Sequence, residues 1–176
     1  MQRDTNIWRL AATLPDALIE KVAVHSRAPQ TSVVRAVAEL LADTYRLGLK
    51  AQNFHWNVTG PQFQQLHKLF GDQYDELSDA TDEIAEHLRA LGSRAPASFA
   101  EFETLSSIQD SVTPQTAASM CCELACGFEQ VGCAAEALAS LAGSLGDDAT
   151  ADLAASRARA CSKAAWMLKS HTPQAV

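Results

Sequence analysis

Histidines and carboxylates are concentrated in one stretch of this 176-residue chain, between residues 53 and 86. The segment NFHWNVTGPQFQQLH at 53–67 contains His55 and His67, two of the chain's five histidines. Imidazole nitrogens and carboxylate oxygens together form a mixed ligand set that suits Fe(II) and also accepts Zn or Mn. The stretch is therefore a candidate metal site. Its acidic part places seven acids and no base within fifteen positions, namely Asp72, Asp75, Glu76, Asp79, Asp82, Glu83 and Glu86.

The histidines and the acidic run also have a purely structural interpretation. A histidine on a helix face is usually a packing or surface residue, and an acidic run can simply keep a helix face solvated. This run is costly, however, because four pairs of like charges at i,i+4 spacing each destabilise a helix by roughly 0.2–0.5 kcal/mol. A merely solvated face would usually contain interspersed lysines. We therefore expect a positive partner for the acids and leave both interpretations of the histidines open.

The elements that carry these residues are predicted to be helices. Apolar residues recur at helical spacing, no alternating strand pattern occurs, and proline and glycine fall mostly between the periodic segments. Two long helices, a longer crossover with a short helix, and two further long helices predict an all-α, ferritin-like four-helix bundle over 31–170. Residues 1–30 would be an N-terminal extension with a short helix at about 15–27, and 171–176 a C-terminal tail. The long helices are predicted at about 31–57, 61–92, 114–145 and 149–170, and the crossover at 93–112.

Each long helix has a predicted inward-facing line of residues. On the third helix, Cys122, Cys126 and Cys133 lie opposite that line, and we interpret them as small surface or interface residues, with a thiolate metal site or redox sensor as the alternative. The inward residues are, in chain order, Val37, Leu41, Thr44, Gly48, Ala51 and His55; Phe63, Leu66, Phe70, Leu77, Ile84 and Leu91; Cys121, Leu124, Phe128, Val131, Ala135, Leu138, Ala142 and Leu145; and Leu153, Cys161, Ala164 and Leu168.

Helix geometry separates the histidines from the outermost acids within one chain. Asp82 and Glu86 lie about 140° and 180° around the helix from the core residue Leu77, so both are predicted to point out of the monomer. Asp82 follows His67 by fifteen residues, which is roughly 22 Å along a straight helix. An antiparallel second copy, related by a two-fold axis near residue 75, would bring the histidines of one chain to the acids of the other.

Composition narrows the classes of partner. The formal net charge is −7, with 21 acidic against 14 basic residues, which argues against a general nucleic-acid surface and favours cations. Five cysteines are an odd number, so we expect reduced thiols rather than a disulfide framework. No apolar segment has the length of a signal peptide or membrane helix, and we expect a soluble, cytoplasmic protein.

The segment 53–67, with DEIAE at 82–86, ALG at 90–92, TADL at 150–153 and KAAWML at 163–168, closely resembles the Dps family of mini-ferritins, the DNA-binding proteins from starved cells. The resemblance covers about residues 35–170. It implies a hollow dodecamer with ferroxidase centres between subunits, formed here by His55 and His67 of one chain and Asp82 and Glu86 of another. Iron(II) would be oxidised preferentially with hydrogen peroxide, and the ferric product stored in the cavity, which protects DNA and the cell.

Some positions depart from the family pattern or have two interpretations. Many members carry a further carboxylate where this chain has Gly71, so the second iron position would use Asp72 or a water, or would bind weakly. Trp56 matches a family tryptophan that can intercept radical equivalents, and packing is its alternative role. The acids Asp147, Asp148 and Asp152 could line an iron entry pore or cap the fourth helix.

Two other functional classes are alternatives to a ferroxidase. An intrachain di-iron enzyme would need Glu-x-x-His pairs, and no glutamate in the sequence is followed by a histidine three residues later. A non-catalytic, nucleoid-associated or scaffold protein of the same fold is disfavoured by the acidic charge. Residues 1–14 contain only Arg3 and Arg9 as bases, so we expect DNA binding to be weak or absent.

Overall fold

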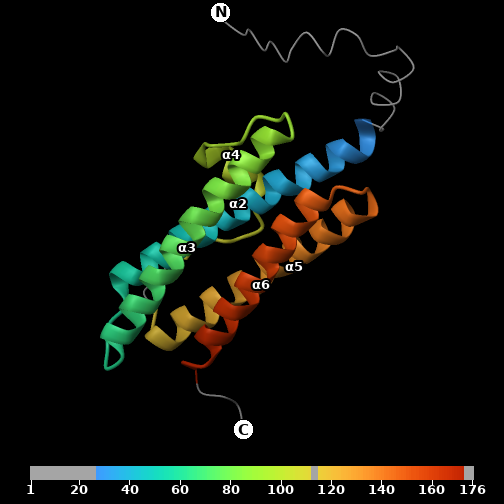
Figure 1. The fold of residues 1–176 in the computed structure, drawn as a ribbon. Coiled ribbons are helices and arrows are strands. Elements are labelled where there is room, and N and C mark those ends of the chain that lie inside the picture. Colours follow the sequence, from blue (N-terminus) through green and yellow to red (C-terminus); the bar gives the residue numbers. More distant parts are fainter. Residues whose placement is uncertain (1–26, 112–114, 173–176) are drawn as a thin grey trace, which may run out of the picture. The chain divides into compact units, whose positions relative to one another are not determined.

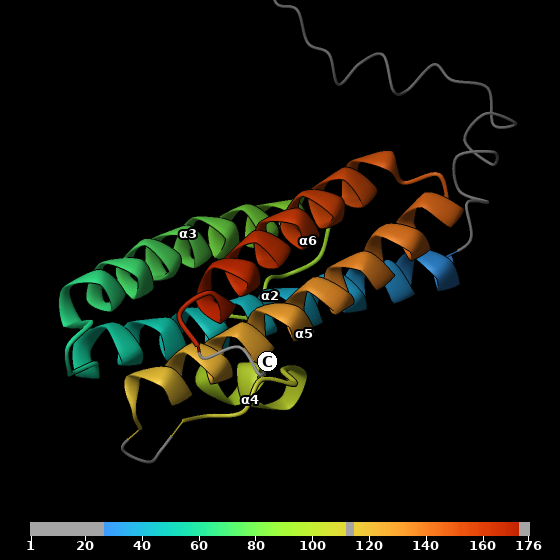
Figure 2. The same ribbon diagram turned by 90° about the horizontal axis from the view of Figure 1, so that it is seen from below.

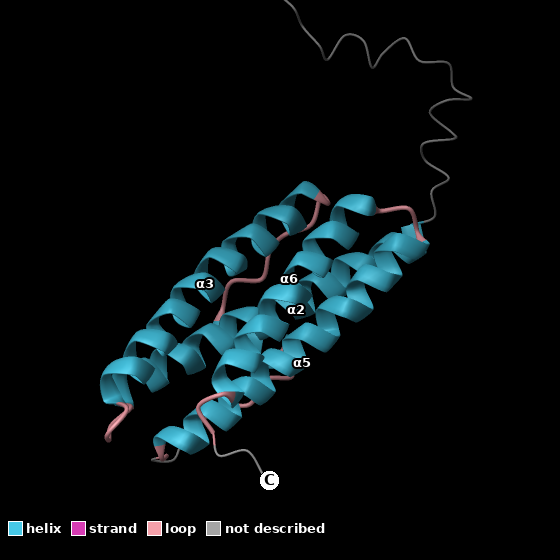
Figure 3. Cartoon of the chain, turned by 60° about the horizontal axis from the view of Figure 1, so that its bottom comes forward, coloured by secondary structure: helices cyan, strands magenta, loops and turns pink. Residues whose placement is uncertain are grey.

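The computed structural model describes residues 27–111 and 115–172, and every regular element in these ranges is a helix. From Val33 onward the described residues form one compact unit, and the description below is of that unit. Within it α2, α3, α5 and α6 run side by side (Figure 1, Figure 3), which confirms the predicted all-α four-helix bundle. Residues 15–26 of the predicted short helix lie outside the described part. The elements are α2 (Arg27–Asn57), α3 (Phe63–Ala90), α4 (Phe99–Leu105), α5 (Ala117–Ser144) and α6 (Asp148–Lys169).

Three predicted helix starts are wrong, by two to four residues. Helix α2 begins at Arg27 rather than 31, so residues 27–30 of the predicted extension belong to this helix. Local hydrogen bonds explain the other two. Pro61 lies in a turn closed by the backbone N–H of Phe63 donating to the carbonyl of Gly60 at 3.0 Å, so α3 begins at Phe63 rather than 61. Helix α5 begins at Ala117 rather than 114, because the Thr116 side chain caps it by accepting from the backbone N–H of Ser119. The proline expected in the first turn of this helix lies outside the described residues.

The predicted core is largely confirmed, and the exceptions lie mostly near helix ends. The prediction of burial is wrong for Phe63 and Leu145, which are 47% and 40% exposed. Phe63 is the first residue of α3, and Leu145 follows the last residue of α5. Leu91, Leu153 and Ala164 are only partly buried. The predicted lines along α2, α3 and α5 are otherwise buried, apart from His55. No helix in 27–111 or 115–172 is both long and apolar enough to span a membrane.

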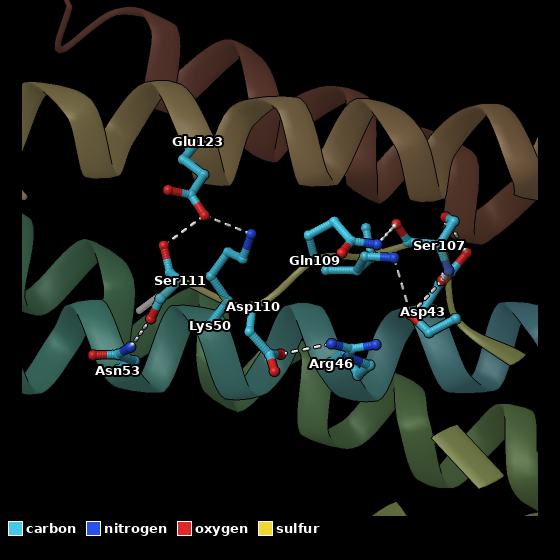
Figure 4. A network of polar contacts seen from close by, with 11 residues as sticks. Asp43, Arg46, Lys50, Asn53, Ser107, Gln109, Asp110, Ser111 and Glu123 are labelled. Carbon is cyan, nitrogen blue, oxygen red and sulfur yellow. Dashed lines mark hydrogen bonds and ion pairs between the residues drawn. The ribbon is translucent and has the colours of Figure 1, made fainter. Parts of the chain in front are cut away.

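The crossover between α3 and α5 passes along one side of the bundle (Figure 2), and its part from Phe102 to Ser111 contacts α2 (Figure 4). The buried carboxylate of Asp43 accepts hydrogen bonds from the Ser106 hydroxyl at 2.7 Å and from the Ser107 backbone N–H at 2.6 Å. On α4 the Phe102 ring stacks on Tyr45, with ring centroids 4.4 Å apart. These contacts hold the crossover on one side of the bundle.

A second polar cluster joins the end of the crossover to α2 and α5 (Figure 4). The ammonium of Lys50 and the hydroxyl of Ser111 each donate to Glu123 at 2.6 Å, and the amide of Gln115 also donates to this carboxylate. Burial raises the pKa of Glu123, but these hydrogen bonds and the Lys50 charge outweigh it, so the pKa lies below its ordinary value. The cluster therefore contains an ionised, well-bonded carboxylate.

Candidate metal centre

The two histidines of the segment 53–67 lie face to face. His55 is in the last turn of α2, His67 is in the second turn of α3, and the short loop between these helices brings the rings together. The imidazoles stack with centroids 3.9 Å apart and planes 19° apart. The Nδ1 atom of His55 lies 2.7 Å from the carbonyl oxygen of His67, and the Nδ1 atom of His67 lies 2.8 Å from the carbonyl oxygen of His55.

This reciprocal bonding fixes the tautomer of both rings. A carbonyl oxygen can only accept a hydrogen bond, so each Nδ1 must carry the proton. In the neutral imidazoles the lone pair then lies on Nε2, and neither Nε2 is hydrogen-bonded to any residue in the described ranges. Metal-binding histidines typically donate their other ring N–H to a carbonyl or carboxylate in this way. His55 and His67 thus each present one nitrogen suited to a metal ion.

The histidine pair is part of a longer stack along α3. The Phe63 ring lies over His67 with centroids 5.1 Å apart. On the other side the His55 ring lies against Gly71, where an added Cβ would be 3.0 Å from Nδ1 and 3.1 Å from Cε1 of that ring. Apolar spacing predicts Phe63 in the core, and the family pattern identifies Gly71 only as a missing carboxylate. The overlooked signal is the four-residue spacing of 63, 67 and 71, which places them on one side of α3.

The predicted acidic ligands lie elsewhere on α3. Asp82 and Glu86 are exposed, and Asp82 is roughly 22 Å along the helix axis from His67. Within the described residues of one chain, no three histidine, cysteine or acidic side chains are grouped so that they could hold a metal. A single chain therefore brings the two histidines together but does not bring the acids to them.

Asp72 and Glu76 are the two acids of the run that have a basic partner. Lys68 donates to both carboxylate oxygens of Asp72, at 2.8 and 2.7 Å, in an exposed i,i+4 pair. Glu76 lies 2.6 Å from the buried guanidinium of Arg157 on α6, in an ion pair without directed hydrogen-bond geometry. For the described ranges no ion pair is present at the remaining acids, which are Asp75, Asp79, Asp82, Glu83 and Glu86.

One of the three acids near the start of α6 has the predicted capping role. Asp147 caps α6, because its side chain accepts from the backbone N–H of Thr150 at 3.1 Å and from the Thr150 hydroxyl at 2.6 Å. The capping role is confirmed for this residue. Asp148 and Asp152 are exposed, and an iron entry pore stays a prediction.

Trp56 and the cysteines are the remaining residues for which the sequence predicts a role. Trp56 is 66% exposed, so it does not pack in the core of its own chain. Cys122, Cys126 and Cys133 are exposed, as predicted, whereas Cys121 and Cys161 are buried. Burial, together with the neighbouring Cys122, raises the pKa of Cys121 to about 11. All five thiols are free.

Comparison with known proteins gives consistent matches over most of the chain. Residues 34–174 match the Ferritin family, described as a ferritin-like domain. Antigen TpF1 of Treponema pallidum (strain Nichols) is 34% identical over 154 residues, which cover 83% of this chain and 87% of the relative. DNA protection during starvation protein 2 of Bacillus anthracis is 33% identical over 142 residues, which cover 81% of this chain and 97% of the relative.

Solved structures agree with these matches. The Dps protein from Vibrio cholerae O1, described as a member of a broad superfamily of ferritin-like diiron-carboxylate proteins, aligns with a TM-score of 0.78 at 27% identity, covering 81% of this chain and 90% of that chain. The crystal structure of antigen TpF1 from Treponema pallidum aligns with a TM-score of 0.82 at 30% identity, covering 86% of this chain and 97% of that chain. The family match, the identities and the shared bundle together show that this chain belongs to the Dps family of ferritin-like proteins.

Proposed function

We propose that this protein is a ferroxidase and iron store that takes Fe(II) as its substrate at sites shared between two copies. His55 and His67 of one copy and Asp82 and Glu86 of the other would bind the iron. The observation that carries this proposal is the histidine pair, whose Nδ1 atoms are both fixed by carbonyls while neither Nε2 atom has a hydrogen-bond partner among the described residues. Dimers of this kind would assemble into a hollow dodecamer that stores the ferric product.

The outer surface of α2 and α3 supports pairing with a second copy. Tyr45, Leu49 and Trp56 are 36%, 44% and 66% exposed, although all three are large and apolar. The first two also line a groove of about 190 Å³ between α2 and α3, together with Tyr74 and Ser78 of α3. Large contiguous apolar surfaces typically mark interaction sites, and we propose that these residues form part of one. The groove lies beside residue 75, where the proposed two-fold axis would pass, so an antiparallel copy would cover it.

The ligand set suits the proposed chemistry. Imidazole and carboxylate ligands together favour Fe(II), and the carboxylates would offset the charge of the cation. We propose hydrogen peroxide as the preferred oxidant. It takes one electron from each of two Fe(II) ions and, with two protons, becomes two molecules of water. No hydroxyl radical is released, so DNA is protected without being bound.

Asp72 is proposed as an accessory ligand for the second iron. Its pairing with Lys68 is solvent-exposed, and an exposed ion pair of this type contributes only about 0–1 kcal/mol. A divalent cation could therefore displace the ammonium. Gly71 offers no side chain at the neighbouring position, so Asp72 or a water would complete this coordination.

The proposal is tested by peroxide-driven iron oxidation in purified protein of known mass. Ferric absorbance is followed after Fe(II) and hydrogen peroxide are added without oxygen. We expect the double variant His55→Ala with Asp82→Ala to be nearly inactive and to keep the oligomeric mass of the unmodified protein. Glu83→Ala is the matched control, since it removes an adjacent acid that lines a groove toward α6, and should retain the normal rate. Unchanged oxidation in the double variant, or a monomeric protein, would contradict the proposal.

A further inference from the structure

Gly71 lies where the backbone of α3 meets the ring of His55. Phe63, His67 and Gly71 follow one another at four-residue steps along α3, and the His55 imidazole enters from α2 between His67 and Gly71. A Cβ at position 71 would lie 3.0 Å from Nδ1 and 3.1 Å from Cε1 of His55. Both distances are shorter than an ordinary van der Waals contact.

We propose that Gly71 is a positioning residue for His55. Because it lacks a side chain, it leaves a slot on α3 in which the imidazole can stack on His67 while its Nδ1 donates to the His67 carbonyl. The Nε2 atom is thereby held in one place and stays free. The metal-binding consequence of this role rests on the proposed function, whereas the contact between Gly71 and His55 does not.

Local backbone structure gives no other reason for a glycine here. Glycine in a helix interior is less favourable than alanine. The glycines with positive φ among the described residues are Gly60, Gly92 and Gly146, so Gly71 has an ordinary helical conformation. Gly143 in α5 is a useful contrast, since a Cβ added there would meet no atom within 4 Å. Of these two helical glycines, only Gly71 has a neighbour that an added methyl group would displace.

A side chain at position 71 would push the His55 ring away from α3. The ring would have to move by a few tenths of an ångström, and we expect this shift to weaken its 2.7 Å hydrogen bond to the His67 carbonyl and its stack on His67. Loss of such an orienting hydrogen bond typically weakens metal binding by about 10- to 100-fold. The opposite expectation holds if Gly71 is only an absent ligand: Gly71→Ala would then be harmless, and Gly71→Asp would strengthen metal binding.

The contact itself is tested in metal-free protein by thermal unfolding. Gly71→Ala and Gly143→Ala are each introduced into the unmodified chain and into His55→Ala. Gly143→Ala should raise the unfolding midpoint in both backgrounds, because alanine favours the helix. Gly71→Ala should lower the midpoint when His55 is present and raise it when His55 is absent. An equal rise in both backgrounds would overturn the role proposed for Gly71.

The consequence for metal binding is tested by calorimetric titration of the assembled, metal-free protein with Zn²⁺. Gly71→Ala should weaken Zn²⁺ binding by about 10- to 100-fold, Gly71→Asp should weaken it as well, and Gly143→Ala should leave it unchanged. Unchanged affinity in Gly71→Ala, or tighter binding in Gly71→Asp, would overturn the proposed positioning role. If the unmodified protein bound no Zn²⁺ or Fe(II), the proposed function would fail, and the unfolding experiment would still decide whether Gly71 positions His55.

Discussion

A metal site shared between two copies predicts that two inactive variants will restore each other's activity. One variant would lack both histidines, through His55→Ala and His67→Ala, and the other would lack both acids, through Asp82→Ala and Glu86→Ala. Each alone should be nearly inactive. In a mixed dimer, one site has neither its histidines nor its acids, but the other combines the intact histidines of one chain with the intact acids of the other. One site in two is then complete.

The size of the recovery follows from random pairing. If the two variants are expressed in equal amounts, half of the dimers are mixed and half of the sites in those dimers are intact, so the initial rate should be about a quarter of normal. Peroxide-dependent ferric absorbance gives the rate, and native mass spectrometry of chains with different tags verifies mixing. If mixed oligomers form but remain as inactive as the separate variants, the ligands do not come from different chains.

Three further predictions concern stability, thiol reactivity and DNA. The pKa of Glu123 is lowered in the folded protein, so its stabilisation is present above the unfolded carboxyl's pKa and is lost as the pH falls through the folded value. Glu123→Gln, which leaves Lys50 without its anion, should lower the free energy of unfolding by about 2 kcal/mol at pH 7. Urea titrations should show that this difference shrinks below about pH 4, and a constant difference would contradict the assignment. Maleimide labelling of the folded protein should rapidly modify the exposed thiols of Cys122, Cys126 and Cys133. The buried thiols of Cys121 and Cys161 should react only after the chain is unfolded, and rapid labelling of all five would contradict their burial. In gel-shift assays at physiological salt, the assembled protein should not retain duplex DNA, because each copy adds a net charge of −7; tight retention would refute this.

Features that depend on local periodicity were predictable from the sequence. The order of the helices follows from apolar spacing, and the ends of α3 and α5 follow from Gly92 and Gly146, which adopt φ values of 82° and 74°. The outward direction of Asp82 and Glu86 also follows from helix geometry, since it needs only their angle from the buried Leu77. Burial predicted from periodicity was wrong at helix ends, because a residue there has no further turn of helix on one side to pack against.

Features that depend on closure of the α2–α3 hairpin were not predictable in the same way. Sequence spacing shows that His55 and His67 can be neighbours, but the crossed hydrogen bonds between their rings and carbonyls require the three-dimensional path of the loop. The contact of His55 with Gly71 depends on the same path. The Lys50–Glu123 pair joins residues 73 positions apart, which no local pattern relates.

The proposed pairing of two chains would account for the acidic run of α3. Its four i,i+4 pairs of like charge oppose helix formation by about 1–2 kcal/mol in total, and only Asp72 and Glu76 have basic partners within the described residues. The neighbouring α2 surface exposes large apolar side chains, including Trp56. Both features are unfavourable in a separated chain. An antiparallel second copy would cover the apolar side chains, and cations bound between its histidines and Asp82 and Glu86 would relieve part of the charge repulsion, so the proposed metal-bound pair would offset both features.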